Sequence, residues 1–209
     1  MNSYIVMVII LAAGQLAEEM KFSRLAGTSG ILGSLLSLVM VLSATFLSSW
    51  FSWRANALSD LGVGEQAALF NSAMLLGGGL NFLFALGLYK YLPIDRLVRT
   101  GSLSLIGSSV CLALIGVFPI DNLIMHAIVA LGYFMLTPAG FLLIGFGTKD
   151  RVISKLSFAC GIAALLAILV LPLIFFVLPF QVGFAVPELT ESVVILIWTI
   201  YMSTKLLRL

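Results

Sequence analysis

The residues best suited to chemistry gather in a few short stretches of an otherwise apolar chain. Residues 50–62, WFSWRANALSDLG, carry Arg54, Asn56, Ser59 and Asp60. A guanidinium can hold a phosphate or carboxylate, amides and hydroxyls can hydrogen-bond a ligand, and a carboxylate can orient a histidine that acts as a general base. The alternative is structural: tryptophans anchor a membrane boundary, and Ser59-Asp60 caps a short helix in the loop that follows.

His126 is the only histidine in the chain. At about 100° per residue, His126, Tyr133 and Thr137 fall within about 20° of one line along a helix, with Ala130 between them. Polar groups below a membrane interface usually face a protein partner or a water-filled cavity, so this stripe predicts an inward-facing polar side of a helix. We take Asp60 and His126 as the candidate catalytic pair. A histidine with only a structural role is the alternative.

Glu188 and Glu191 lie three residues apart after Pro187, on one face of a predicted helix. Acidic residues in a first turn are favoured by the helix dipole, which is a sufficient structural explanation. Two carboxylates so close to a medium of low dielectric constant would nevertheless repel unless a cation, Arg54 or a proton intervened. They therefore join the candidate binding residues, which are Arg54, Asn56, Ser59, Asn71, Asp121, Tyr133, Glu188 and Glu191.

No metal site or cofactor is predicted. One histidine cannot supply the imidazoles that zinc sites favour, and Cys111 and Cys160 are expected at different depths of the membrane.

Composition decides the class of protein that must position these residues. Of 209 residues, 61% are apolar or aromatic and 10% are charged, with a mean hydropathy of +1.18. These values exclude a soluble globular enzyme, for which a quarter of the residues would be charged. The formal net charge of +2 offers no basic field for nucleic acid. Membrane lipids are the expected partners, and a protein partner or a homo-oligomer is left open.

Uncharged runs of about 20 residues can cross the hydrocarbon core as helices, and the chain holds five of them. A sixth run is free of charge only over residues 192–204, so this helix must begin near Pro187 to span. We predict an all-α polytopic transmembrane bundle. Its six core helices are expected near residues 27–50, 67–90, 98–118, 123–147, 155–178 and 187–206. We expect a kink at Pro172 and an irregular segment from Pro179 to Val186. Residues 25–209 would form the transmembrane domain, and residues 1–24 an apolar segment that is interfacial or forms a short extra helix.

Basic residues give the orientation, because cytoplasmic loops are enriched in lysine and arginine. Ten of the eleven basic residues flank one side of the predicted spans, and Arg54 stands alone on the other. A cell membrane protein with both ends of the six-helix core in the cytoplasm is expected. The candidate site would then lie at the extracytoplasmic edge.

Several of these residues resemble a known pattern. NALSDLG at 56–62, Phe70-Asn71, GVFP at 116–119 and the downstream His126 resemble the prokaryotic six-helix membrane family catalogued as domain of unknown function 998, over roughly residues 25–205. The resemblance implies a fold and a site at one membrane face but no biochemical activity. More distantly, the chain is similar to the DRAM and Sfk-type membrane proteins, some of which are linked to lipid handling.

Three functions remain open at this point. The polar cluster could bind, or also process, a lipid or other amphiphile. It could serve as the vestibule of a small ion or solute transporter with His126 as a proton relay, although no ionisable residue is expected at mid-depth. It could also hold a partner in a membrane complex. Whether the chain is an enzyme is not decided by its sequence.

Overall fold

The computed structural model describes residues 3–173 and 183–209, with side chains from residue 18 onward. Within these ranges the chain is helical and contains no strand. Its elements are α1 (Ser3–Leu47), the 3-10 helix η1 (Leu58–Gly62), α2 (Ala67–Tyr91), α3 (Arg96–Val117), α4 (Leu123–Gly147), α5 (Arg151–Leu165), the π-helical turn η2 (Leu166–Val170) and α7 (Ala185–Leu206). The predicted all-α fold is confirmed.

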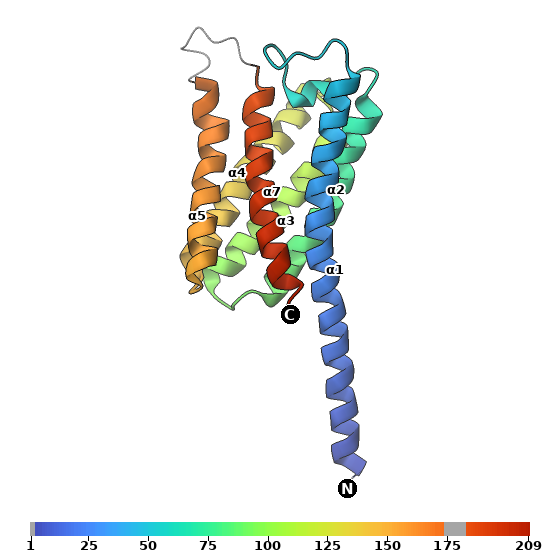
Figure 1. Ribbon diagram of the computed structural model, residues 1–209, viewed down its shortest axis with the longest axis vertical. Helices are drawn as coiled ribbons and strands as arrows, with labels where there is room; N and C mark the ends of the chain where they lie inside the picture. Colours follow the sequence, from blue (N-terminus) through green and yellow to red (C-terminus); the bar gives the residue numbers. More distant parts are fainter. Residues whose placement is uncertain (1–2, 174–182) are drawn as a thin grey trace.

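Six helices of the described chain are long and apolar enough to cross a membrane. They run alternately up and down, so that successive loops fall at opposite ends (Figure 1). Many large apolar side chains remain exposed, among them Phe46 at 86% and Ile124 at 74%. Such a surface is unfavourable in water and suits the acyl chains of a bilayer, so the chain is a multi-pass integral membrane protein.

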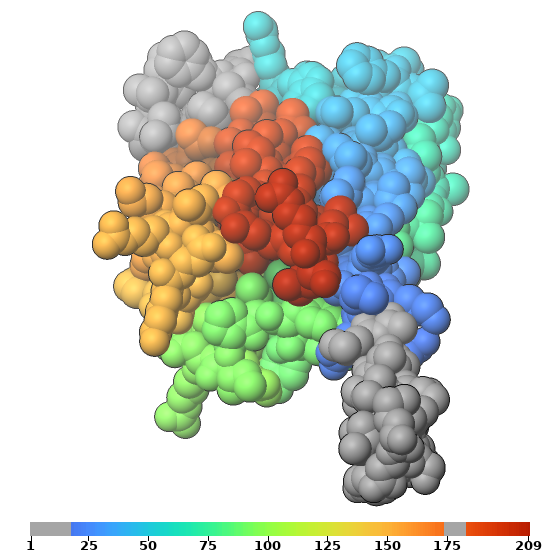
Figure 2. Space-filling view, turned by 60° about the horizontal axis from the view of Figure 1, so that its bottom comes forward, coloured from blue at the N-terminus to red at the C-terminus, as the bar shows by residue number. Residues whose placement is uncertain are grey.

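The helices form a closed ring. Each spanning helix packs on its neighbours in the chain, from α1 through α5, and α7 packs on both α5 and α1. Figure 2 shows α7 lying between α5 and α1 on the surface. We call the end with residues 48–66 the upper end and the end with residues 92–95 and 148–150 the lower end (Figure 1).

Aspartates begin the two helices that start at the lower end. Asp95 accepts hydrogen bonds from the backbone N–H groups of Leu97 and Val98, and Asp150 accepts them from those of Val152 and Ile153. The bonds from Ile153 and Val152 lower the pKa of Asp150 below its ordinary value. Each cap satisfies backbone donors that a helix start leaves unpaired.

The N-terminal segment differs from its expected form. No separate short helix precedes α1, since one helix runs without a break from Ser3 to Leu47. Glu18 and Lys21 pair at 2.8 Å one turn apart, and the Tyr91 hydroxyl donates to the Glu19 carbonyl, so the chain is held in helical form across the expected boundary. At about 1.5 Å per residue this helix is much longer than a bilayer core. Its first part extends beyond the lower end (Figure 1).

A kink was expected near Pro172, and the structure has a local change of helix type just before this residue. The N–H of Leu171 bonds to the carbonyl of Leu166, five residues back, which defines the π turn η2. A π turn placed just before a proline changes the hydrogen-bond register where the proline ring would otherwise crowd the preceding turn. Pro179 and half of the expected irregular segment, residues 179–182, lie outside the described residues, and α7 begins two residues earlier than predicted.

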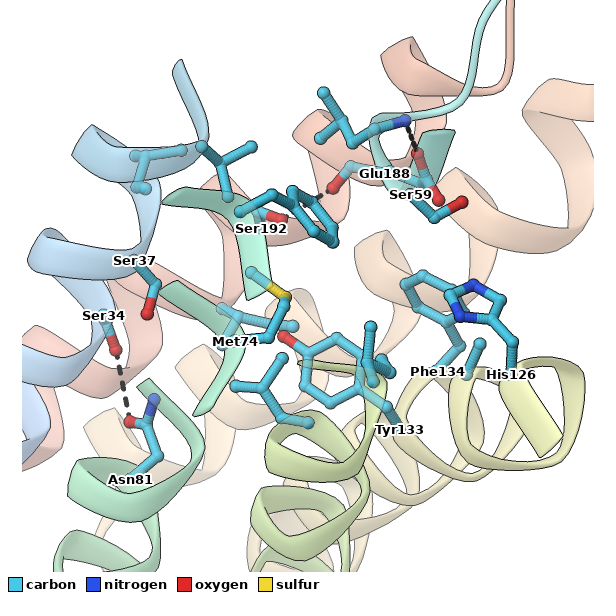
Figure 3. Close-up of a pocket in the computed structure, with 18 residues that line it drawn as sticks. Ser34, Ser37, Ser59, Met74, Asn81, His126, Tyr133, Phe134, Glu188 and Ser192 are labelled. Carbon is cyan, nitrogen blue, oxygen red and sulfur yellow. Dashed lines mark hydrogen bonds between the residues drawn. The ribbon is translucent and has the colours of Figure 1, made fainter. Parts of the chain in front are cut away.

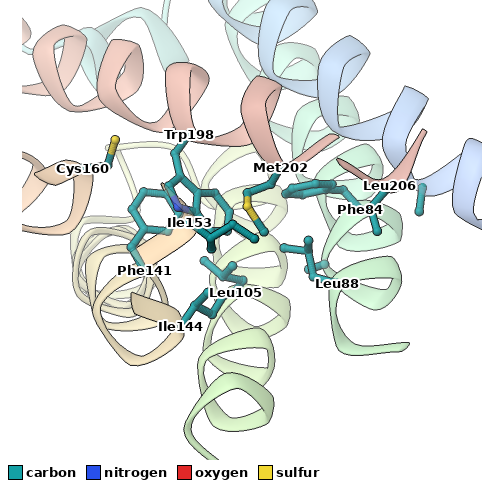
Figure 4. Close-up of a cluster of buried hydrophobic side chains, with 12 residues drawn as sticks. Phe84, Leu88, Leu105, Phe141, Ile144, Ile153, Cys160, Trp198, Met202 and Leu206 are labelled. Carbon is teal, nitrogen blue, oxygen red and sulfur yellow. The ribbon is translucent and has the colours of Figure 1, made fainter. Parts of the chain in front are cut away.

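The interior of the lower half is filled by an apolar cluster centred on Trp198, which is 0% exposed (Figure 4). Its ring stacks on Phe141 with centroids 4.1 Å apart and meets Phe84 edge-on at 6.3 Å. The indole N–H donates to the Ser157 hydroxyl at 2.9 Å, so its one polar group is satisfied within the protein. This cluster joins α2, α4, α5 and α7 across the ring.

Replacing Trp198 should separate packing from hydrogen bonding. Trp198→Ala should destabilise the protein by about 3–5 kcal/mol, because it opens a cavity and leaves Ser157 without its donor. Trp198→Phe keeps most of the volume and should cost less. Unfolding in mixed micelles checks both values. A loss in the alanine variant no larger than that in the phenylalanine variant would contradict this account of the core.

Candidate functional site

A cavity of about 100 Å³ lies inside the ring in its upper half. It is enclosed by five spanning helices and η1, and Figure 3 shows the side chains that line it. The polar lining residues are Ser34, Ser37, Ser59, Asn81, His126, Tyr133, Glu188 and Ser192. The remaining wall is apolar and includes Leu38, Val41, Phe70, Met74, Ile115 and Phe134.

The polar groups fall into two sets. Ser59 of η1, His126 of α4 and Glu188 of α7 lie together in the upper part of the view in Figure 3. Ser34 and Asn81 lie deeper, where the Ser34 hydroxyl donates to the Asn81 side-chain oxygen at 3.3 Å. Ser37, Tyr133 and Ser192 lie between these sets beside Met74, so the wall combines polar and apolar side chains along its length (Figure 3).

The hydrogen bond of His126 fixes its tautomer. Its Nδ1 lies 2.9 Å from the carbonyl oxygen of Phe118, and His126 is only 5% exposed. A carbonyl can only accept, so Nδ1 must carry the proton, and Nε2 of the neutral ring is left as a hydrogen-bond acceptor. Phe118 ends α3 and His126 lies in the first turn of α4, so the loop between these helices sets the ring orientation.

Glu188 ties α7 to η1. Its Oε2 accepts a hydrogen bond from the backbone N–H of Leu58, and the residue is 8% exposed. Nearby, Ala185 N–H donates to the Asn56 carbonyl and Gly183 N–H to the Trp53 carbonyl, each at 2.9 Å. A Cβ on Gly183 would come within 2.5 Å of the Asn56 oxygen, so this approach of the two segments requires glycine.

Asp60 does not pair with His126, which corrects the predicted catalytic pair. Its Oδ2 accepts from the Asn56 side-chain amide at 3.1 Å and from the Ala57 N–H at 2.9 Å. It does not line the cavity, and the Phe118 carbonyl orients His126 in its place. The Asp60 carboxylate therefore stabilises its own loop, in agreement with the structural alternative for this stretch.

The other predicted residues divide between cavity and surface. Ser59, Tyr133 and Glu188 line the cavity, whereas Arg54 and Asp121 are exposed and do not. Asn56 bonds within its loop. Asn71 donates from its side chain to the Gly62 carbonyl at 3.0 Å. The structure thus brings three of the eight predicted binding residues to the cavity wall.

Glu191 is fully buried, and neither of its carboxylate oxygens has a hydrogen-bond partner among the described residues. It lies outside the cavity lining but within electrostatic range of Tyr133 and Glu188. The three ion pairs in the described chain all involve residues of the lower half. In the described chain, therefore, no basic residue forms an ion pair with Glu188 or Glu191.

The stripe predicted on α4 is confirmed. His126, Ala130 and Tyr133 line the upper cavity, and Tyr133 and Thr137 line a smaller one of about 40 Å³ deeper in the bundle. The Thr137 hydroxyl bonds to that of Ser108 on α3. The side of α4 that carries these residues therefore faces the interior.

Sequence reasoning missed the deeper polar residues Ser34, Ser37 and Ser192 as parts of the site, and gave Asn81 no role in it. Ser37 donates to the carbonyls of Gly33 and Ala73, which accounts for a serine at that depth. Asn81 in the middle of an apolar run was the available signal, because an amide in hydrocarbon is costly unless it is partnered. No group of three or more histidine, cysteine or acidic residues in the described chain could hold a metal ion.

Fold and site define a helical polytopic membrane protein with an internal cavity near one membrane edge. The chain matches the family described as protein of unknown function DUF998 over residues 31–205, and it belongs to that family. No curated protein and no solved structure matches it. The more distant similarity to DRAM and Sfk-type proteins stays a prediction.

Replacing Asp60 should test its structural role. Asp60→Ala removes the acceptor of two hydrogen bonds and should destabilise the protein by about 1–3 kcal/mol, whereas Asp60→Asn keeps an oxygen acceptor and should cost less. Asp121→Ala is the matched control at the same end, because Asp121 is exposed, and it should change stability by no more than about 0.5 kcal/mol. Unfolding and amide exchange at Ala57 measure these effects. Unchanged exchange at Ala57 in Asp60→Ala would contradict the assignment.

Proposed function

We propose that this protein binds part of a lipid or other amphiphile in the upper cavity. The supporting observation is the cavity itself, which joins an apolar wall to the polar end formed by Ser59, His126 and Glu188. Pockets for small ligands combine these two features, with a few polar groups that fix orientation. Its place inside a ring of membrane helices favours a ligand drawn from the bilayer.

The size of the cavity limits what it encloses. An engineered cavity of about 150 Å³ in another protein holds benzene, so a volume of about 100 Å³ accommodates a short piece of a molecule. A polar head with the first few carbons of a chain fits this limit. The rest of the amphiphile would remain among the surrounding lipids.

Binding accounts for the geometry better than catalysis. The Nε2 of His126 could accept a proton, and Ser59 also lines the cavity. A hydrolytic triad needs a carboxylate that orients the histidine, and Asp60 is engaged with Asn56 and Ala57 instead. The proposal therefore rests on binding alone.

Transport is a weaker proposal for this arrangement. The smaller cavity is itself lined by Phe141 and Trp198, and the interior around it in the described chain is occupied by the apolar cluster that also contains Met202. A solute would have to displace this apolar packing to pass. A role as a subunit of a complex would instead use the exposed upper surface, including Arg54 and Asp121.

We also propose that the upper end faces away from the cytoplasm, in the cell membrane. Ten of the eleven basic residues flank the lower ends of the spans or α1 below them, and Arg54 alone is at the upper end. This asymmetry follows the usual enrichment of lysine and arginine in cytoplasmic loops.

Filling the cavity should expel a bound amphiphile. Ala130 on α4 lines the cavity, so Ala130→Phe should lower the amount of co-purified lipid at least several-fold, measured by native mass spectrometry after mild detergent extraction. Ala127 lies on the same helix but is exposed on its outer face, so Ala127→Phe is the matched control and should retain lipid. Equal lipid content in the two variants would reject the cavity as the binding site.

The orientation can be tested by thiol labelling of a variant in which Cys111 and Cys160 are replaced by alanine. Arg54 at the upper end and Arg151 at the lower end are both exposed. In intact cells, Arg54→Cys should react with a membrane-impermeant maleimide, whereas Arg151→Cys should react only after permeabilisation. The reverse pattern would invert the proposed topology.

A further inference from the structure

We infer that the head group held in the upper cavity is a positively charged hydrogen-bond donor, an alkylamine or other ammonium-bearing amphiphile, and not a phosphate. This inference rests on the proposed function, since it names the class of molecule that the same cavity takes. It also reverses the chemistry expected from the sequence, in which Arg54 was to hold an anion.

The polar lining of the cavity contains one carboxylate, and its one basic group among the described residues is the His126 imidazole. Glu188 contributes a carboxylate, which can accept about four hydrogen bonds and faces the backbone N–H groups of Leu58 and Ser59. His126 contributes Nε2, which accepts when the ring is neutral, because Nδ1 then carries the proton that bonds to the Phe118 carbonyl. No described lysine or arginine lines the cavity, and Arg54 is exposed outside it.

Apart from the carboxylate and the imidazole, the remaining polar groups of the lining are neutral, and the Tyr133 hydroxyl and the Asn81 amide can donate as well as accept. Ser192 already donates its proton to the Glu188 carbonyl at 2.8 Å, so its oxygen is left to accept. Ser59 can act in either sense, as any hydroxyl can. A phosphate at this end would meet the Glu188 carboxylate without a compensating cation, whereas an ammonium would supply the counter-charge that the lining lacks.

Glu191 provides a second observation. It is fully buried, one turn along α7 from Glu188, and its carboxylate has no hydrogen-bond partner among the described residues. Buried charges are normally paired, and no basic residue of the described chain pairs with either glutamate. With both glutamates ionised, a cationic head near Glu188 would reduce the unfavourable interaction between the two carboxylates. It would leave the apolar wall formed by Val41, Phe70 and Met74 for the alkyl chain.

Three six-carbon probes distinguish the head groups at constant chain length: hexylammonium, 1-hexanol and hexyl phosphate. The full chain is placed in phosphatidylcholine nanodiscs, and affinity is taken from the shift in thermal unfolding, with Ala130→Phe in the same discs correcting for partition into the bilayer. Hexylammonium should bind at least about tenfold more tightly than hexanol, in line with the greater strength of charge-assisted hydrogen bonds. Hexyl phosphate should bind most weakly.

A matched pair of variants locates the preference. Glu188→Gln keeps an oxygen that can accept from Leu58 N–H but removes the charge, and it should reduce the preference for hexylammonium over hexanol to about twofold or less. Arg54→Ala should leave all three affinities unchanged, because Arg54 is exposed outside the cavity. The order of the probes in the unaltered protein decides the question even if Glu188→Gln fails to fold.

The outcomes separate the two proposals. Tighter binding of hexyl phosphate, or a loss of its binding in Arg54→Ala, would overturn the cationic assignment and leave amphiphile binding in place. Equal binding of hexanol and hexylammonium would overturn it as well, as would an unchanged preference in a folded Glu188→Gln protein. If none of the probes binds more tightly to the unaltered protein than to Ala130→Phe, the cavity is not an amphiphile site, and the proposed function itself fails.

Discussion

The whole molecule depends on one constraint: a polar group inside the hydrocarbon layer must find its partner within the protein. The backbone satisfies this constraint by forming helices, and most buried polar side chains satisfy it through individual hydrogen bonds. Trp198 donates to Ser157, Ser37 to two backbone carbonyls, and the His126 ring to the Phe118 carbonyl. A buried polar group that has such a partner contributes to the structure. Among the described residues a few buried atoms have no partner, including the Ser48 and Ser203 hydroxyls, and Glu191 is the acidic residue in this group. Its position one turn from Glu188 draws attention to the upper cavity.

The same constraint explains the residues that resemble the family pattern. Asn56 bonds to Asp60, Gly62 accepts from Asn71, and the Phe118 carbonyl orients His126. A Cβ on Gly62 would lie 3.1 Å from the Asn71 oxygen and 3.5 Å from Pro119, so these segments meet at one point. The pattern therefore describes how the upper end of the bundle closes, and the cavity forms beneath this closure. Of these pattern residues, only Leu58, Ser59, Phe70 and His126 reach the cavity wall.

The fold was predictable because hydropathy and helix length leave few choices in a bilayer. The side of α4 that faces the interior was predictable as well, since helical phase alone places His126, Tyr133 and Thr137 on one line. The prediction that Asp60 pairs with His126 was wrong, because the order of residues along the chain does not reveal which backbone carbonyl or side-chain amide lies nearest to each of them. Arg54 and Asp121 were assigned to the site by depth, and depth does not tell whether a side chain points inward. The start of α1 was not predictable, because the length of an apolar stretch does not determine where a helix begins or ends.

Close helix contacts and a pair of large aromatic side chains together determine where the cavity can form. On one side of the ring, Gly77 faces Ser37 of α1 and Gly78 faces Ala113 of α3, at distances that leave no room for a Cβ, so α1, α2 and α3 approach closely. In the lower half, the stacked rings of Phe141 on α4 and Trp198 on α7 fill the space between these two helices. Both rings line the smaller cavity together with Tyr133, and of these three residues Tyr133 alone also lines the upper cavity. The upper cavity is therefore the space beyond this aromatic pair, where α1, α2, α3, α4 and α7 meet beneath η1.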